Sequence, residues 1–115
     1  MIMELVGLVI SNGNIEQVVN LAKKEEWDEI FIVSNQDSLP LGKKHALIKI
    51  NSNSRLVDMK ADLLKKLKGR LKGTEVALSI ASGTGKEHMA IISALLSIPV
   101  GIRFVALTKD GIVHL

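Results

Sequence analysis

Apolar and polar positions form blocks along the chain, and the blocks have two different periods. Residues 5–10 are a short apolar run that ends in "SNGN", and the next segment has apolar residues at helical spacing: Ile15, Val18, Val19 and Ala22. This pattern predicts a strand, a polar loop and an amphipathic helix, in that order. The segments "EIFIVS" (29–34) and "HALIKI" (45–50) are rich in β-branched residues and predict two further strands.

The second half of the chain repeats this alternation. Ser54 is placed to cap a helix whose apolar stripe runs to Leu67 and whose outer face is basic. "EVALSIA" (75–81) is almost continuously apolar, which is typical of a central parallel strand covered on both faces. Residues 86–98 predict a helix that is apolar almost all round, and the remainder predicts a hairpin that turns at "KDG".

Strands that alternate with helices predict an α/β fold, with a mainly parallel sheet, right-handed crossovers and a C-terminal β-hairpin. The third strand is an exception, because "NQDSLPLGKK" is shorter than a usual crossover helix. We therefore expect it to be an irregular edge strand and leave its direction open. In such sheets ligands bind outside the carboxyl ends of the strands, which draws attention to residues 11–14 and 82–88.

Composition narrows the class of protein. The 115 residues, 47% apolar and 23% charged, fit a single globular domain over 1–115. Cysteine is absent, which excludes disulfides and thiolate metal sites and agrees with a cytoplasmic location. The opening segment resembles a strand more than a signal peptide, and Pro99 and Arg103 interrupt the longest apolar run, so we expect no membrane span. A net charge of +3 favours an anionic partner slightly.

The segment "SIASGTGKEHMA" (79–90) resembles a phosphate-binding Walker loop. A Walker loop needs glycine where this chain has Ile80, and Ser or Thr where it has Glu87, so we exclude an ATPase. The loop still suits an anion, because Gly83 and Gly85 let backbone N–H groups approach a ligand and Lys86 adds charge at a helix N-terminus.

Several neighbouring residues allow two interpretations. Ser82 and Thr84 either donate hydrogen bonds to a phosphate or ribose, or cap the helix. In the first loop, residues 12–14 either bind a ligand or form only a turn and a helix cap; they are Asn12, Gly13 and Asn14. His88 faces either the ligand or solvent. The three histidines lack metal-ligand spacing, so we expect neither a metal nor another cofactor.

The order of elements, together with "SGTGKEHMA", resembles the CRISPR-associated Rossmann-fold (CARF) family. Gly83, Thr84, Lys86 and Met89 occupy the positions of that family's loop motif. The resemblance covers most of the chain in element order, but its sequence-specific part is this one motif. It implies a Rossmann-like three-layer sandwich. The chain departs from the family in two respects. "GTGK" replaces the more usual "GTK" and thereby shifts Lys86 along the helix by one residue, and the short "NQDSLPLGKK" stands in place of a full crossover helix.

The resemblance also implies a function in CRISPR antiviral defence. CARF domains form homodimers that bind a cyclic oligoadenylate second messenger, and members called ring nucleases also cut it without a metal. Ser11 and Lys86 stand where a serine and a lysine matter for cutting in those members. In such a reaction the ligand's own ribose 2′-OH attacks phosphorus, and the site supplies alignment and charge stabilisation. Binding alone and binding with cleavage both remain open.

Two other functions compete with this one. The basic helix face from Lys60 to Lys72 is suited to contact nucleic-acid phosphates, although three aromatic residues offer little base stacking. Alternatively, the chain is an interaction module that only dimerises, through the apolar helix segment from Met89 to Ile98. We rank both below the nucleotide-binding function.

Overall fold

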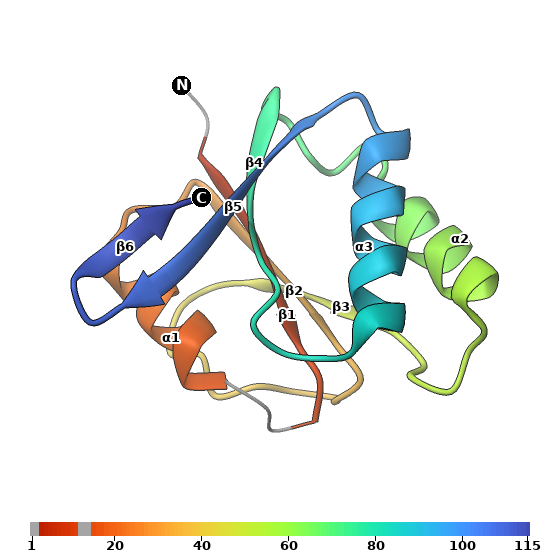
Figure 1. Cartoon of the computed structure of the whole chain (residues 1–115), viewed down its shortest axis with the longest axis horizontal. Coiled ribbons are helices and arrows are strands. Elements are labelled where there is room, and N and C mark those ends of the chain that lie inside the picture. Colours follow the sequence, from red (N-terminus) through yellow and green to blue (C-terminus); the bar gives the residue numbers. More distant parts are fainter. Residues whose placement is uncertain (1–2, 12–14) are drawn as a thin grey trace.

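The computed structural model describes residues 3–11 and 15–115. The elements follow one another as β1 (Glu4–Val9), α1 (Ile15–Lys24), β2 (Glu29–Ser34), β3 (Ala46–Lys49), α2 (Leu56–Leu67), β4 (Glu75–Ser79), α3 (Gly85–Ser97), β5 (Gly101–Thr108) and β6 (Gly111–His114). They build a six-stranded sheet of order β3-β2-β1-β4-β5-β6 (Figure 1). The first five strands in this order, β3, β2, β1, β4 and β5, pair in parallel with their neighbours. Strand β6 pairs antiparallel with β5. The predicted mainly parallel α/β fold with a terminal hairpin is confirmed.

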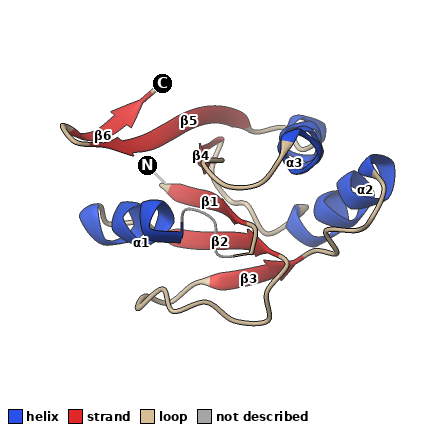
Figure 2. Cartoon of the chain, turned by 60° about the horizontal axis from the view of Figure 1, so that its bottom comes forward, coloured by secondary structure: helices blue, strands red, loops and turns tan. Residues whose placement is uncertain are grey.

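Helices cover both faces of the sheet. Helix α1 lies on one face, and α2 and α3 lie side by side on the other (Figure 2). The reason is the handedness of crossovers: the chain moves outward from β1 to β2, then back across to β4 and β5, so right-handed connections must use opposite faces. The result is a Rossmann-like three-layer sandwich. Connections therefore leave β1 and its neighbour β4 toward opposite faces, which makes their carboxyl ends the topological switch point.

Each face has its own apolar core. The core beneath α2 and α3 includes Leu8, Phe31, Met59, Leu78 and Ile91. The core beneath α1 includes Leu5, Val18, Leu21, Ile32 and Leu41. All six residues of β1 are buried, because this central strand contributes alternate side chains to the two cores.

Strand β3 is parallel to β2, which settles the direction that the sequence left open. The connection of residues 35–45 contains no helix, yet Leu39 and Leu41 pack in the core beneath α1. Eleven residues reach at most about 36 Å when extended, and returning along a four-residue strand needs only about 13 Å. Lys43 donates from Nζ to the carbonyl oxygens of Ala22 and Glu25, at 2.8 and 3.3 Å, and so ties the connection to the end of α1. A packed loop thus replaces the crossover helix.

If Ser54 were the N-cap, helix α2 would begin at residue 55, but it begins one residue later, at Leu56. Its N-cap residue is Arg55, which makes no side-chain cap hydrogen bond and whose guanidinium instead pairs with Asp58 at 3.2 Å. The prediction of Ser54 as the N-cap was therefore wrong. Burial of Met59, Leu63 and Leu67 against the sheet holds the helix in place without that cap.

No helix within the described part of the chain is long and apolar enough to cross a membrane. The long apolar run of the sequence is divided between α3 and β5, as the interruption at Pro99 predicts.

Candidate functional site

A buried serine joins the two loops at the switch point. Ser82, which is 4% exposed, accepts a hydrogen bond through Oγ from the Ile10 N–H at 2.9 Å, and the same Oγ lies 3.4 Å from the Ile10 carbonyl oxygen. The end of β1 and the loop after β4 are therefore fixed to each other. Ser82 uses its hydroxyl for this link, rather than as a cap of α3.

Ser11 follows this link directly and is exposed. Its backbone has φ of +56°, a conformation that few non-glycine residues adopt. The Ser11 N–H donates to Oδ1 of Asn35 at 2.8 Å, so the residue after β2 stabilises this turn. The other predicted residues of the first loop, Asn12, Gly13 and Asn14, lie outside the described residues.

The start of α3 needs glycine and a cap. Gly83 has φ of +86°, and a Cβ there would lie 3.1 Å from Leu8 and 3.2 Å from Ile10. The Glu87 carboxylate accepts hydrogen bonds from the Thr84 N–H at 3.1 Å and from the Thr84 hydroxyl at 2.8 Å. Thr84 is thus the N-cap residue of α3, and Glu87 completes a capping box.

The Glu87 carboxylate is held in its charged form. Burial raises the pKa of this carboxyl, but hydrogen bonds from the Thr84 hydroxyl and N–H, with the nearby Lys86 charge, lower it by more. The pKa of Glu87 therefore lies below its usual 4.5. An ionised, fully engaged carboxylate suits helix capping and not proton transfer at neutral pH.

Lys86 and His88 are half-buried and point toward backbone oxygens at the same edge. Lys86 Nζ donates to the Ser52 carbonyl at 2.7 Å, which connects α3 to the segment between β3 and α2. His88 Nε2 lies 2.7 Å from the Ser82 carbonyl; because a carbonyl only accepts, this nitrogen carries the proton. Gly85 directly precedes Lys86, and nothing is within 4 Å of the position its Cβ would take. The backbone there remains accessible to a ligand.

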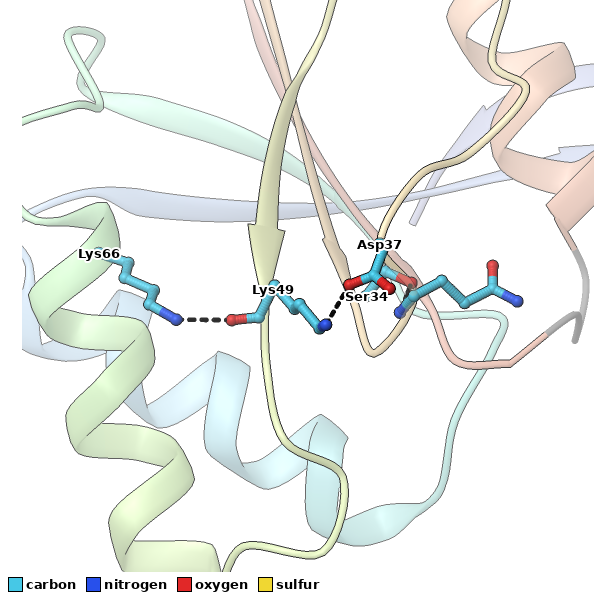
Figure 3. A network of polar contacts seen from close by, with 5 residues as sticks. Ser34, Asp37, Lys49 and Lys66 are labelled. Atoms are coloured by element: carbon cyan, nitrogen blue, oxygen red, sulfur yellow. Dashed lines mark hydrogen bonds and ion pairs between the residues drawn. The ribbon is translucent and has the colours of Figure 1, made fainter.

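A cavity of about 530 Å³ extends this edge toward β3. Its lining comes from the ends of β2 and β3 and from α2: Asn35, Lys49, Ile50, Asn51, Ser52, Asp62 and Lys66. Figure 3 shows Lys66 donating to the Lys49 carbonyl, at 2.6 Å, and the Lys49 ammonium paired with Asp37. Lys66 Nζ is also 3.0 Å from Asp62.

The sequence-based interpretation missed these cavity residues. A signal was present, because Asn35 directly follows β2 and Asn51 follows β3 after one residue. Polar residues at the carboxyl ends of parallel strands are brought to one edge by the topology alone.

A second cavity, of about 560 Å³, lies at the opposite edge of the sheet. Its lining includes Met3, Trp27, Ala77 and Arg103. Arg103 pairs with Glu75 at 3.0 Å, and the buried Glu4 accepts from the N–H groups of Lys72 and Gly73. Arg103, Glu75 and Glu4 in this cavity thus already have partners within the chain.

The basic face of α2 and the segment after it is only partly available to a partner. Lys66 is engaged as described, and the Arg70 guanidinium lies 5.5 Å above the ring of Phe31. Lys65 and Lys68 are exposed. Among residues 3–11 and 15–115, no three histidine or carboxylate side chains lie together in a way that could hold a metal ion.

The fold and the two joined loops define a Rossmann-like α/β domain with its polar site at the carboxyl edge of the sheet. No protein-family model matches this chain, and a comparison with curated proteins finds no match either.

Proposed function

We propose that this domain binds a cyclic oligoadenylate across a homodimer interface and cleaves it without a metal. The observation that carries the proposal is the Ser82 link, which holds Ser11 and the glycine–lysine loop at one edge of the sheet. Backbone N–H groups at a helix N-terminus, next to an ammonium group, form a favourable site for a phosphodiester.

The exposed face of α3 supports the dimer. Met89 is 61% exposed and Leu96 is 68% exposed, with half-buried Ile92 between them at helical spacing. Large apolar side chains in a row on a surface helix are typical of protein–protein contacts. Because Met89 lies one turn from Lys86, a two-fold contact through this face brings both copies of the loop toward one ligand.

Cleavage requires only groups already present at this edge. The ribose 2′-oxygen of the ligand attacks the adjacent phosphorus, the bond to the 5′-oxygen breaks, and the products are a 2′,3′-cyclic phosphate and a 5′-hydroxyl. Lys86 stabilises the negative charge that develops on the phosphate oxygens, and its three donors let it retain Ser52 as a partner. The Ser11 hydroxyl makes no hydrogen bond to another described residue, so it is available to orient the ribose or phosphate.

The test uses purified protein, EDTA, and radiolabelled cyclic tetra- and hexa-adenylate. Retention by the protein and conversion to linear products are followed for the wild type, Ser11→Ala, Lys86→Ala and Lys65→Ala. We expect conversion that both site variants lose by at least about 100-fold, as is usual for loss of one charge-stabilising donor. Lys65→Ala removes an exposed lysine of α2 and is the matched control for charge.

The outcomes separate the alternatives. Tight retention without conversion leaves a binding domain and refutes cleavage. If neither ring is retained or converted, the proposal is wrong, and the exposed lysines of α2 become the candidate. In that case retention of duplex DNA falls steeply with rising salt concentration.

A further inference from the structure

The cavity of about 560 Å³ at the amino edge of the sheet is separate from the residues proposed to bind a nucleotide. Part of the central strand β4 is uncovered there. Val76 and Leu78 are fully buried in the core beneath α2 and α3, whereas Ala77 between them points to the side of α1 and is only half-buried. Because β4 lies between β1 and β5, burial on both faces is expected, so the cavity over Ala77 is a gap in the layer above the sheet.

Apolar side chains form one side of this cavity. They come from three segments: Met3 before β1, Trp27 before β2 and Ala77 in β4. Trp27 Nε1 already donates to the Leu21 carbonyl oxygen at 2.9 Å, which satisfies the polar atom of the indole and orients its ring. The cavity volume lies within the range of small-molecule sites, which are mostly apolar with a few polar groups. This side of the cavity therefore suits the hydrocarbon part of a ligand.

The polar groups of the lining differ in how far the chain itself uses them. Both carboxylates accept hydrogen bonds: Glu4 from backbone N–H groups before β4, and Glu75 from Arg103 Nε at 3.0 Å. The donors are less engaged. The two Nη groups of Arg103, the Lys72 ammonium and the His114 ring make no hydrogen bond to another described residue. The wall therefore offers a ligand mainly donors and positive charge.

Arg103 and His114 stand on adjacent strands and on the same face of the sheet. His114 pairs with Val105 in the antiparallel register of β5 and β6, and Arg103 is two residues before Val105, so the two side chains are diagonal neighbours. The bond from Nε to Glu75 orients the Arg103 guanidinium and leaves both Nη groups for a second acceptor. A planar guanidinium is well suited to donate two parallel hydrogen bonds to a carboxylate.

We propose that this cavity binds an amphipathic carboxylate. The hydrocarbon part lies against Met3, Trp27 and Ala77. The carboxylate accepts hydrogen bonds from Arg103 and His114. This site goes beyond the proposed function and does not depend on it, because none of its residues belongs to the loops at the carboxyl edge of the sheet.

The single tryptophan of the chain lies in the cavity wall, so its fluorescence reports binding. The full chain is titrated with octanoate, octan-1-ol, octylammonium and acetate. We expect octanoate to change the Trp27 emission in a saturable way and to bind at least about 10-fold more tightly than octan-1-ol or octylammonium, which lack the negative charge. Acetate should leave the emission unchanged because it lacks the apolar part.

Two substitutions test the two halves of the site separately. Arg103→Gln should weaken octanoate binding about 10-fold and leave binding of octan-1-ol unchanged. Arg55→Gln is its matched control, because Arg55 also pairs through Nε with a carboxylate, that of Asp58 at 3.2 Å, and lies outside the lining. Ala77→Leu places hydrocarbon in the cavity and should weaken binding of both compounds, whereas Ala61→Leu, at an exposed position of α2, should weaken neither.

Selective loss of octanoate in Arg103→Gln, with loss of both compounds in Ala77→Leu, supports the site. The proposal is overturned if octanoate leaves the Trp27 emission unchanged up to about 10 mM, or if octan-1-ol binds as tightly as octanoate. Equal weakening by Arg103→Gln and Arg55→Gln also overturns it, because the effect would then be one of net charge. Arg103 is exposed, so its replacement keeps the fold and the test stands even if Ala77→Leu does not fold.

Discussion

At the scale of single residues, Glu87 shows how the surroundings assign a role to a side chain. In the sequence it follows a lysine in a glycine-rich loop, where a carboxylate has several possible uses. The structure buries it to 4% exposure and gives both Thr84 donors to it. Its charged carboxylate therefore caps the N-terminus of α3 and contributes to the stability of the fold.

This role predicts a pH-dependent effect on stability. The pKa of Glu87 is lower in the folded chain than its usual 4.5, so the folded state binds fewer protons there than the unfolded state. The stabilisation is then present above about pH 4.5 and is lost as the pH falls through the lower folded pKa. Glu87→Gln should reduce the free energy of unfolding by about 1 kcal/mol at pH 7, and by progressively less at acidic pH.

Urea unfolding at pH 7 and pH 3 measures this difference. Glu26→Gln is the control, because Glu26 is exposed and lies outside the helices, and it should change stability by less than about 0.5 kcal/mol at either pH. An effect of Glu87→Gln that is equal at both pH values would show that the charge is not the source of the stabilisation.

At the scale of elements, the decisive contact joins the end of β1 to the beginning of α3. Ser82 makes this contact across 72 residues of sequence, so no local pattern reveals it. Ser82→Ala leaves the half-buried Ile10 N–H without its acceptor, and loss of such a hydrogen bond costs about 1 kcal/mol. We expect that loss in thermal or urea unfolding, together with weaker retention of ligand.

Ser97→Ala provides the comparison for Ser82→Ala. Ser97 also donates to a backbone carbonyl, at 2.9 Å, but it is exposed at the end of α3. Its replacement should change the free energy of unfolding by no more than about 0.5 kcal/mol. Similar losses in the two variants would contradict the importance of the link between the loops.

The third strand shows where element prediction from sequence reaches its limit. Length alone argues against a parallel connection without a helix, and that argument left the direction of β3 open. In the structure, Leu39 and Leu41 pack in the core beneath α1, and this packing holds the helix-free connection in place. Two leucines in a proline-containing loop are a weak signal, because burial depends on what the rest of the chain places above and below them.

At the scale of the whole molecule, the proposed homodimer depends on the apolar face of α3, where Met89 and Leu96 are exposed in the single chain. Leu96→Glu should shift the proposed homodimer to monomer in size-exclusion chromatography with light scattering, because it introduces a charge into an apolar contact. Val57→Glu, at a 74% exposed position of α2, should leave the dimer intact. A wild-type chain that is monomeric at 100 µM would contradict the dimer directly.

Only part of the site could be predicted from the sequence, because local spacing does not show which distant segments meet. The glycines and lysine of residues 82–88 stand close together in the sequence, so their spacing alone indicates an anion-binding loop. The cavity residues Asn35, Asn51 and Lys66 come from three separate segments. Only the pairing of β2 with β3, and the packing of α2 beside them, brings these side chains together.

The sequence by itself determined the elements, their order and the class of fold, since these follow from apolar periodicity and from the handedness of crossovers. It also determined that α3 begins in a glycine-rich, positively charged loop. Tertiary structure decided the direction of β3, the use of Ser82 as a link rather than a cap, and the meeting of Asn35, Asn51 and Lys66 at one cavity. The physical reason is that periodicity is a local property, whereas burial and hydrogen-bond partners depend on segments far apart in the chain.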